Sequence, residues 1–482
     1  MSPIQTTKMT NYRWVICAML FFATTVNYMD RQVLSLTWKD FIAPEFHWTD
    51  SDYGTITGLF SIFYAIACLF AGKFIDWMGT KKGYLWAIFV WSTGACLHAI
   101  CGWVTMQIEG VASIDALRAV EAGSNMALAI ASTSVWLFLA CRLVLALGEA
   151  GNFPAAIKVT AEYFPKKDRA FATSIFNAGA SVGALAAPAS IPLLARAWGW
   201  EMAFIIIGAL GYIWMGLWVF LYDKPEKNKH VNKAELTYIE QDDEAEAANA
   251  DAKEEKAIGF GKCFTYRQTW SFIVGKFMTD GVWWFFLFWA PAYFSDQYGY
   301  TSDSTMGIML IFTLYAICTV LSIFGGYLPT YFVDKKGMNP YAGRMLAMLI
   351  FACFPILALV AQPLGQYSVW WPCIIIGLVG AGHQAWSANL FSTIGDMFPK
   401  STIASVTGIG AMAGGVGSFL INKGSGVLFT YAEGQGSAFT FMGFEGKPAG
   451  YMIIFCICAV AYLIGWSIMK TLVPKYKPIV LD

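Results

Sequence analysis

Twelve apolar segments, each about long enough to cross a lipid bilayer, dominate this sequence of 482 residues. A spanning helix needs roughly 20 apolar residues. Such segments lie near residues 12–37, 53–74, 83–105, 127–156, 170–194, 201–222, 270–295, 304–332, 343–362, 369–396, 402–430 and 449–471. Charged residues make up only 13 % of the chain, whereas soluble domains carry about 25 %. The sequence therefore predicts an all-α integral membrane protein with twelve transmembrane helices, and it argues against a soluble globular enzyme.

The basic residues are distributed unevenly between the two sides of the predicted membrane. Of the 32 lysines and arginines, four lie well inside predicted spans and four in the loops of one side, which leaves 24 for the other side when residues at the span ends are counted with the adjoining loops. The four loop residues are Lys39, Arg118, Arg196 and Lys447. Because cytoplasmic loops carry the excess of lysine and arginine, we expect both termini to be cytoplasmic.

One strongly polar interval divides the chain into halves. Residues 223–269 are rich in Glu, Lys, Ala and Asp and separate six predicted spans from six. We therefore expect an N-terminal lobe at residues 1–222, a cytoplasmic linker at 223–269 with solvated charges, and a C-terminal lobe at 270–482.

A weak internal repeat supports this division. The sequence Glu-Tyr-Phe-Pro-Lys at 162–166, after the fourth span, is echoed by Asp-Met-Phe-Pro-Lys at 396–400, after the tenth. Two parallel six-helix repeats are typical of transporters in which one half rocks against the other around a central site. The repeat therefore favours two six-helix pseudo-repeats; the alternative is that such turns merely suit short cytoplasmic loops.

The loop after the second span carries a pattern that resembles the major facilitator superfamily. Its motif residues in this sequence are Gly72, Asp76, Gly79, Lys81 and Lys82. In that motif a glycine permits close helix approach and an aspartate faces basic residues. The resemblance implies the major facilitator fold.

Two further patterns narrow the resemblance. Residues 27–31 of the first span, and Arg142 with residues 148–150 of the fourth, resemble the anion:cation symporter family. Residues 382–391 resemble its hexuronate transporter branch. The resemblance implies import of glucuronate or galacturonate by alternating access across a bacterial inner membrane, with protons as the coupling ion and no cofactor.

Three features depart from the family pattern or have no counterpart in it. Residues 106–125 form a longer external loop, Lys423 lies inside the eleventh span, and residues 439–447 extend another external loop. These departures leave the outer mouth of the protein unpredicted.

Four ionisable residues lie in the first and fourth spans: Asp30, Arg31, Arg142 and Glu149. Each would cost about 2.5–3.5 kcal/mol at the bilayer centre if it stood alone. Arg142 and Glu149 are seven residues apart and therefore share a face of one helix. The four side chains must pair with one another or face a wet cavity.

The chemistry of these residues indicates their roles. A guanidinium can hold a carboxylate through two charge-assisted hydrogen bonds, so Arg31 is the first candidate for the substrate carboxylate, with Arg142 as a further contact. Occupancy of an arginine can decide whether Glu149 or Asp30 holds a proton, which would couple protons to substrate. The alternative is a permanent structural ion pair between the two spans.

Further candidates for substrate contact, with less evidence than Arg31, are polar or aromatic residues within spans. The stronger of them are Tyr28, Tyr64, Trp284, Gln384, Trp386 and Asn389. The weaker are Asn177, Lys276 and His383. Buried amides need partners, which favours a ligand contact for Gln384 and Asn389. For His383 we favour an interhelical hydrogen bond, and for Lys276 an i,i+4 pair with Asp280 or snorkelling to the surface.

These residues are also compatible with other cargoes and with another class of function. The same fold could carry another organic anion, such as an aldarate, an aldonate or a simple carboxylate. A membrane sensor that binds a sugar acid without transporting it is a further alternative, although it needs no proton carrier. The eleven cysteines show no metal-ligand or disulfide pattern, the zero net charge gives no reason to expect nucleic acid, and we expect a functional monomer in the lipid bilayer.

Overall fold

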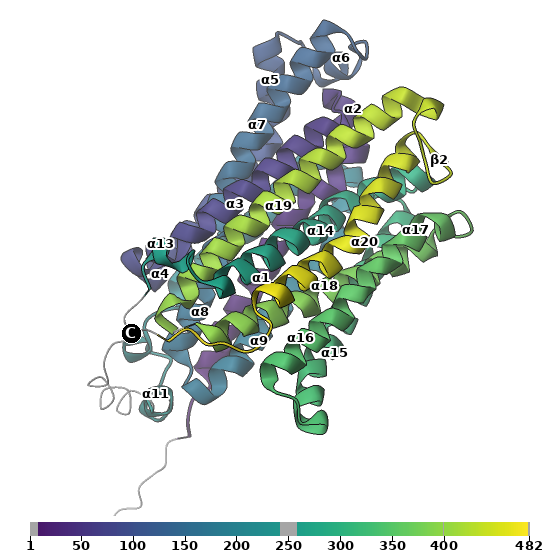
Figure 1. Cartoon of the computed structure of the whole chain (residues 1–482). Coiled ribbons are helices and arrows are strands. Elements are labelled where there is room, and N and C mark those ends of the chain that lie inside the picture. The colour runs from purple at the N-terminus through teal and green to yellow at the C-terminus, as the bar shows by residue number, and fades with distance from the viewer. Residues whose placement is uncertain (1–7, 242–257, 399, 481–482) are drawn as a thin grey trace, which may run out of the picture.

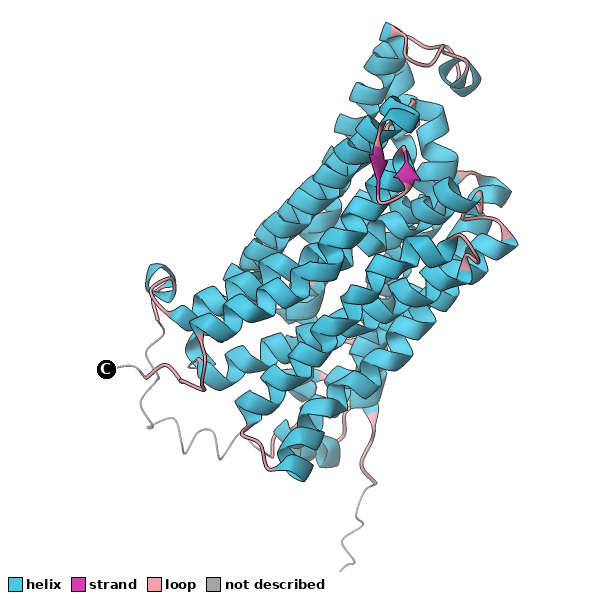
Figure 2. Ribbon diagram, turned by 45° about the vertical axis from the view of Figure 1, so that its right-hand side comes forward, coloured by secondary structure: helices cyan, strands magenta, loops and turns pink. Residues whose placement is uncertain are grey.

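The computed structural model describes residues 8–241, 258–398 and 400–480 of the chain. Figure 1 shows an elongated bundle of helices, with α11 and the C-terminus at one end and α5, α6 and β2 at the other. We call the end that carries α5 and α6 the outer end. Figure 2 shows that helices make up the body of the described chain and that the two short strands lie at the outer end.

The predicted spans of the N-terminal lobe are helical. The long helices are α1 (Tyr12–Thr37), α3 (Asp50–Met78), α4 (Thr80–Leu97), α7 (Asn125–Glu149), α8 (Asn152–Tyr163), α9 (Lys166–Trp198) and α10 (Trp200–Leu221). Shorter elements at the outer end are the π-helix η1 (Trp38–Ile42), α2 (Ala43–Phe46), η2 (His98–Ile100), α5 (Cys101–Glu109) and α6 (Ile114–Arg118). The predicted segments agree with the helices apart from a few residues at their ends, except that the fourth, 127–156, runs across the break between α7 and α8 and ends within α8.

The linker and the C-terminal lobe follow the same pattern. The linker contains η3 (Pro225–Lys227), α11 (Lys233–Ile239) and α13 (Phe260–Cys263). The lobe contains α14 (Arg267–Tyr298), α15 (Thr305–Lys336), α16 (Pro340–Cys353), η4 (Phe354–Leu357), α17 (Ala358–Gly365), α18 (Trp370–Met397), α19 (Lys400–Gln435), η5 (Gly436–Ala438) and α20 (Lys447–Leu472). Strands β1 (Thr440–Phe441) and β2 (Phe444–Glu445) pair antiparallel between α19 and α20.

Nine segments of the described chain are long and apolar enough to cross a membrane. They are Asp50–Ile75, Thr80–Glu109, Asn125–Tyr163, Ile175–Trp198, Trp200–Leu221, Thr305–Lys336, Pro340–Gly365, Ser405–Ala438 and Lys447–Leu472. The other three predicted spans are the long helices α1, α14 and α18. These three carry most of the polar side chains that the sequence assigns to the substrate site, and the count of twelve spans stays a prediction.

The helix that carries Glu149 ends at that residue for a local reason. Proline has no backbone N–H and cannot bond the carbonyl four residues earlier. Pro154 therefore cannot bond the carbonyl of Ala150, and the helix is interrupted between α7 and α8. Glu149 is thus the last residue of α7.

Glycines allow α7 to lie directly against α4. A Cβ atom on Gly148 would lie 2.3 Å from the backbone nitrogen of Trp91, and one on Gly94 would lie 2.7 Å from that of Leu145. Such distances exclude any side chain at either position. The close packing holds the Glu149 end of α7 firmly against its neighbour.

The described part of the linker is attached to the N-terminal lobe. Glu235 of α11 is fully buried and pairs with Arg13 at 3.0 Å. Its carboxylate also accepts hydrogen bonds from the hydroxyl of Thr10 and the backbone N–H groups of Tyr12 and Arg13. The expectation that the linker charges are solvated is therefore wrong for Glu235, which caps the start of α1.

The loop motif between α3 and α4 is only partly as expected. Gly79 adopts a positive φ of 82° where α3 ends, a conformation that favours glycine. A Cβ on Gly72 would meet no atom within 4 Å, so the close approach expected there is absent from this structure. It occurs instead at Gly83, where a Cβ would lie 3.1 Å from the side chain of Ile75.

The charges of this motif are found at the surface. Lys81 pairs with Asp223 at 3.0 Å, with both side chains substantially exposed. Lys82 is exposed. The side chain of Asp76 lies outside the described part of the structure, so the expected contact between that aspartate and basic residues stays a prediction.

We expect Gly148→Ala to destabilise the protein, because the added methyl group would overlap the backbone of α4. Overpacking of this kind costs about 1–3 kcal/mol. The measurement is the thermal unfolding temperature in detergent. The matched control is Gly216→Ala on α10, where a Cβ meets nothing within 4 Å; it should be at least as stable as the parent, because alanine is favoured over glycine in a helix by about 0.5–1 kcal/mol. Equal stability of the two variants would contradict the argument.

Candidate functional site

The intramembrane charges predicted from the sequence gather between α1 and α7. The Nε of Arg31 donates to Oε2 of Glu149 at 3.1 Å, and the two side chains are only 4 % and 0 % exposed. The amide oxygen of Asn27, one turn earlier on α1, accepts a further bond from Arg31 at 3.5 Å. The expectation that these charges pair with one another is confirmed for Arg31 and Glu149.

Three aromatic rings surround the Arg31 guanidinium. Its central carbon lies 5.2 Å from the ring centre of Tyr28, 4.6 Å from that of Tyr64 and 5.3 Å from that of Trp284. Aromatic faces attract a cation within about 6 Å. Trp284 belongs to α14 of the C-terminal lobe, so the ion pair lies where the two lobes meet.

Asp30 and Arg142 are buried beside this pair. Neither carboxylate oxygen of Asp30 makes a well-formed hydrogen bond to a described residue, although the indole N–H of Trp91 on α4 is close enough to interact with the carboxylate. Arg142 lies over the ring of Phe60 at 4.5 Å and donates to the backbone oxygen of Arg31 at 3.5 Å. Because a buried ionised carboxylate without hydrogen bonds is costly, this geometry favours a proton on Asp30.

Some polar atoms of the buried charged residues make no hydrogen bond. Within the described structure, Nε and one terminal nitrogen of Arg142, together with Oε1 of Glu149, lack partners. Buried polar atoms are normally satisfied. Arg142 and Glu149 therefore keep donors and an acceptor that no described residue uses.

The three candidate residues of α18 differ in their burial and in their contacts. Gln384 is half-buried. Trp386 is fully buried and packs edge-on against Tyr462 of α20, with ring centres 5.5 Å apart. Asn389 donates to the backbone oxygen of Ala385 in its own helix at 2.8 Å. In this structure, therefore, the Trp386 ring is fully buried, one of the two N–H donors of the Asn389 amide is used within its own helix, and Gln384 is the most exposed of the three.

The remaining candidates also have identifiable surroundings. Nδ1 of His383 shares a hydrogen bond with the hydroxyl of Tyr462 at 2.5 Å, which confirms the expected interhelical bond. Lys276 pairs with Asp280 at 2.7 Å, as its i,i+4 spacing predicts. Asn177 is exposed on α9 and is not brought to the Arg31–Glu149 pair by any contact in the described structure.

A cluster of four charges joins the lobes at the outer end, and sequence reasoning missed it. Lys39 lies 3.3 Å from Asp50 and 2.8 Å from Asp296, while Lys447 lies 2.5 Å from Asp50 and 2.6 Å from Asp296. Burial lowers the pKa of Lys39, but the charges of Asp50 and Asp296 outweigh it and raise that pKa overall, so Lys39 stays protonated. The one sequence signal for this contact is the presence of both acidic and basic residues near the ends of the predicted spans.

Polar contacts continue this closure along α3 and α19. Nζ of Lys423 donates to the hydroxyls of Ser51 at 3.0 Å and Thr55 at 2.6 Å, which accounts for the unexplained lysine in the eleventh span. Further along, the hydroxyls of Ser61 and Ser418 share a hydrogen bond of 2.7 Å. These contacts lie in the half of α3 nearest the outer end, so the lobes are closed there.

The extra external segment is anchored to the N-terminal lobe. Arg118 of α6 pairs with the buried Glu45 of α2, whose other oxygen accepts the indole N–H of Trp200 at 2.9 Å. A ring nitrogen of His47 bonds the backbone oxygen of Leu117 at 3.0 Å. The departure at residues 106–125 is therefore attached to this lobe through the contacts of α6 with α2 and His47.

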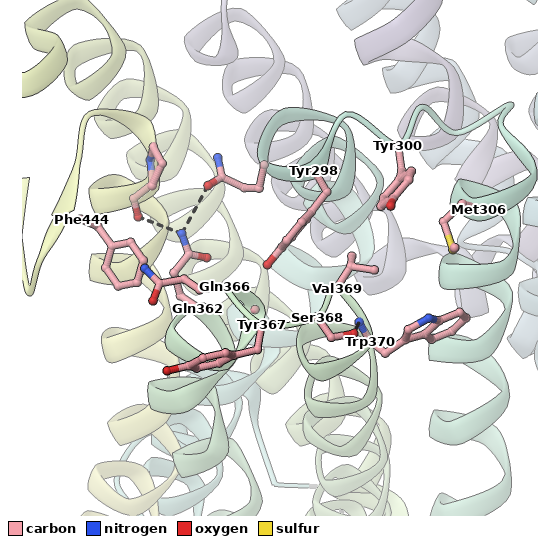
Figure 3. Close-up of a pocket in the computed structure, with 13 residues that line it drawn as sticks. Tyr298, Tyr300, Met306, Gln362, Gln366, Tyr367, Ser368, Val369, Trp370 and Phe444 are labelled. Atoms are coloured by element: carbon pink, nitrogen blue, oxygen red, sulfur yellow. Dashed lines mark hydrogen bonds between the residues drawn. The ribbon is translucent and has the colours of Figure 1, made fainter.

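A hollow of about 580 Å³ lies at the outer end of the C-terminal lobe (Figure 3), and its lining includes Gln297 and Pro448, the sequence neighbours of Asp296 and Lys447. Gln362 donates there to Gln297 and to the backbone oxygen of Pro448, each at 3.3 Å. Amides, tyrosines and apolar groups line it, without a lysine, an arginine or a histidine. It lacks a cation for a carboxylate, so we do not take it as the anion site.

Comparisons with known proteins agree with this architecture. A family model described as the Major Facilitator Superfamily matches residues 20–421. The hexuronate transporter of Escherichia coli (strain K12) is 26 % identical over 473 residues, which cover 96 % of this chain and 95 % of that protein. The galacturonate transporter of Dickeya chrysanthemi is 27 % identical over 354 residues, covering 72 % of this chain and 90 % of that protein.

A solved structure shares the fold at low identity. It is that of a bacterial homologue of the human lysosomal transporter Spinster in an inward-facing, occupied conformation, with a TM-score of 0.65 and 18 % identity. The alignment covers 96 % of this chain and 97 % of that one. The expected all-helical fold is therefore confirmed.

We expect Glu149→Leu to destabilise the protein by about 3–5 kcal/mol, because it leaves the buried Arg31 without its partner. Thermal unfolding in detergent measures the loss. Replacing both residues by leucine should recover much of it, since an apolar pair carries no desolvation penalty. The control is Lys81→Gln, which breaks an exposed pair worth at most about 1 kcal/mol. If Glu149→Leu unfolded no earlier than Lys81→Gln, the pair would not be a desolvated one.

Proposed function

The chain belongs to the Major Facilitator Superfamily and is a multi-pass membrane transporter rather than an enzyme, and from this premise we propose that it imports a hexuronate together with protons. The relatives named above carry hexuronate and galacturonate, so a sugar acid is the supported class of substrate. Glucuronate and galacturonate are the substrates that we propose.

One observation carries the proposal: Arg31 forms an ion pair with Glu149 at the junction of the two lobes, beneath aromatic rings from both. A guanidinium binds a carboxylate through two parallel hydrogen bonds that a lysine cannot reproduce. Tyr28, Tyr64 and Trp284 offer hydroxyl, indole and ring surfaces to a polyhydroxylated ring. The site thus combines an anion clamp with the apolar and polar contacts that a sugar acid needs.

The same ion pair can couple protons to substrate. While Glu149 is ionised, its carboxylate is paired with the Arg31 guanidinium. When Glu149 takes up a proton its charge disappears, and Arg31 is free to bind the substrate carboxylate instead. The buried site then keeps the same net charge, because one carboxylate has replaced another and the proton has entered with it. Release of the substrate lets Glu149 lose its proton and restore the pair.

Asp30 is the second proposed proton carrier. It lies close enough to Glu149, Arg142 and the indole N–H of Trp91 to interact with all three, and its oxygens make no well-formed hydrogen bond to a described residue. A proton on Asp30 avoids two neighbouring negative charges in a buried site. Arg142, held by Phe60 and the backbone of α1, is placed to act on both acids.

The proposed location is the bacterial inner membrane, with both termini in the cytoplasm. The bias of lysine and arginine between the loops supports this orientation. In that orientation the lobes are closed on the outer side by the cluster of Lys39, Asp50, Asp296 and Lys447. Opening of this cluster and closing of the cytoplasmic side would admit the substrate from outside.

We expect Glu149→Gln to exchange substrate but not to concentrate it, because glutamine carries no proton that can be released. The measurement is uptake of labelled glucuronate into proteoliposomes under an imposed pH gradient, compared with counterflow in the absence of a gradient. The parent protein should accumulate glucuronate when the gradient is present and lose this accumulation when an uncoupler dissipates it.

Two results would argue against this function. Accumulation by Glu149→Gln equal to that of the parent would remove Glu149 from the coupling. Binding of glucuronate by the parent without any flux would favour a membrane sensor. Competition by unlabelled aldonates and simple carboxylates in the same assay ranks the other possible substrates.

We expect Arg31→Lys to raise the KM for glucuronate by about tenfold or more, the value of one lost hydrogen bond to a charged group. Initial rates of uptake over a range of glucuronate concentrations measure the change. The matched control is Arg344→Lys on α16, where the guanidinium bonds the backbone oxygen of Ser392 at an exposed position. An unchanged KM in Arg31→Lys would show that this arginine does not hold the carboxylate.

A further inference from the structure

The hollow at the outer end of the C-terminal lobe is built by three separate parts of that lobe (Figure 3). The outer end of α14 contributes Gln297 and Tyr298, and the turn between α17 and α18 contributes Gln366 and, at the start of α18, Trp370. The hairpin before α20 contributes Phe444. The volume of about 580 Å³ lies within the range of small-molecule sites, about 300–1,000 Å³. The hollow is therefore large enough for a ligand of the size of a sugar.

A buried glutamine fixes the walls of this hollow. Gln362 of α17 is 5 % exposed, and its amide oxygen accepts a hydrogen bond from the hydroxyl of Tyr293 on α14 at 2.6 Å. Its amide nitrogen donates to the side-chain oxygen of Gln297 and to the backbone oxygen of Pro448, at 3.3 Å each. Because these bonds join α14, α17 and α20, they hold the three walls in a fixed arrangement.

Other polar groups of the lining are available to a ligand. Within the part of the chain that the structure describes, the side-chain amide of Gln366 and the indole N–H of Trp370 bond no other residue. The amide of Gln297 uses its oxygen for Gln362 and keeps its nitrogen free. Gln366 is exposed, and the other two are half-buried. A ligand in the hollow can therefore reach two amides and an indole that no described residue has taken up.

The chemistry of the lining selects an uncharged ligand. The described residues that line the hollow include no lysine, arginine, histidine, aspartate or glutamate. Their charged sequence neighbours, Asp296 and Lys447, already pair with each other at 2.6 Å. A hydroxyl both donates and accepts hydrogen bonds, as an amide does, and an aromatic ring offers an apolar face. Amides beside aromatic rings therefore suit the hydroxyls and the C–H surface of a neutral sugar.

The rings in the hollow differ from those that membrane proteins place against lipid. Tryptophan and tyrosine are common at the membrane interface, and Trp371, which is exposed and does not line the hollow, fits that role. Figure 3 shows instead the Tyr298 side chain pointing toward Gln362 and Gln366, with Phe444 beyond them. These rings face amides across a shared space, which favours contact with a ligand over contact with lipid.

We propose that this hollow binds an uncharged hexose, at a site separate from that of the transported anion. Gln297, Gln366 and Trp370 supply hydrogen bonds to the hydroxyls of the sugar, and Tyr298 and Phe444 supply apolar surface. The sugar acts there as an effector of transport and is not the cargo. Binding of the hexose is independent of the proposed function, whereas its effect on uptake rests on that function.

The walls of the hollow are continuous with the charged cluster that closes the outer end. The two partners of the Gln362 nitrogen, Gln297 and Pro448, directly follow Asp296 and Lys447 in the sequence. Both of these charged residues also pair with charges of the N-terminal lobe. A ligand that holds them where they meet the other lobe favours the closed state over the open one. The bound hexose should therefore slow uptake of the anion.

The binding test uses labelled D-glucose and D-galactose, the uncharged counterparts of the two uronates, and equilibrium dialysis against the full-length protein in detergent. We expect saturable binding of at least one hexose. Gln366→Leu and Trp370→Leu should each weaken it by about threefold to tenfold, the value of one neutral hydrogen bond. The matched controls are Gln435→Leu, an exposed glutamine at the end of α19, and Trp371→Leu. Both controls should bind the hexose as the parent does.

The effect on transport is measured in proteoliposomes that contain the full-length protein. The hexose, present on both sides of the membrane, should lower the rate of glucuronate uptake, and more glucuronate should not relieve the loss. Gln366→Leu should need about threefold to tenfold more hexose for the same inhibition. Unchanged uptake at hexose concentrations that fill the site would overturn the action on the outer cluster.

Further results separate the hollow from the central site. Galacturonate should not displace the bound hexose, because the hollow has no cation for its carboxylate, and Arg31→Lys should bind the hexose as the parent does. Displacement by galacturonate, or loss of binding in Arg31→Lys, would place the hexose at the central ion pair and overturn the proposal. Equal binding by the hollow variants and their controls, or no saturable binding of either hexose, would also overturn it. A parent that binds hexose but does not transport glucuronate would overturn the proposed hexuronate import and leave the hexose site in place.

Discussion

The burial of opposite charges between α1 and α7 is the constraint on which the rest of the structure depends. Arg31 and Glu149 have almost no exposed side-chain surface, and each offsets part of the cost of burying the charge of the other. The helix interruption before Pro154 and the close contact at Gly148 hold Glu149 in reach of α1. In the function we propose, a proton on Glu149 and a substrate carboxylate on Arg31 together replace this pair.

The contacts between the lobes are arranged around this pair. Polar groups and small residues connect α3 with α19 in the outer half of the bundle, and the four charges of Lys39, Asp50, Asp296 and Lys447 join the lobes at its outer end. Trp284 brings the C-terminal lobe to Arg31. A change of charge at the centre therefore acts on a residue that both lobes touch, which is what alternating access requires of its site.

Sequence reasoning succeeded where the physical rule was local or applied to single helices. The long apolar segments predicted the helices because a bilayer-sized run of apolar residues has few other structures available to it. The spacing of Lys276 and Asp280 predicted their pair, and the need to pair intramembrane charges predicted the partnership of Arg31 with one of the acids. It was less successful for α18: the composition of residues 384–389 does not show that Trp386 turns toward Tyr462 or that Asn389 bonds its own helix.

The sequence by itself therefore determined that this chain is a helical membrane protein. It also determined that its few intramembrane charges must pair with one another or face water. Only the tertiary structure decided which charges meet. Lys39 and Asp296 are far apart in the chain, as are Arg31 and Glu149, and their contacts depend on how the helices cross and rotate. Burial and hydropathy constrain each helix separately, whereas an ion pair between helices requires two specific faces to meet, and that depends on the packing of the whole bundle.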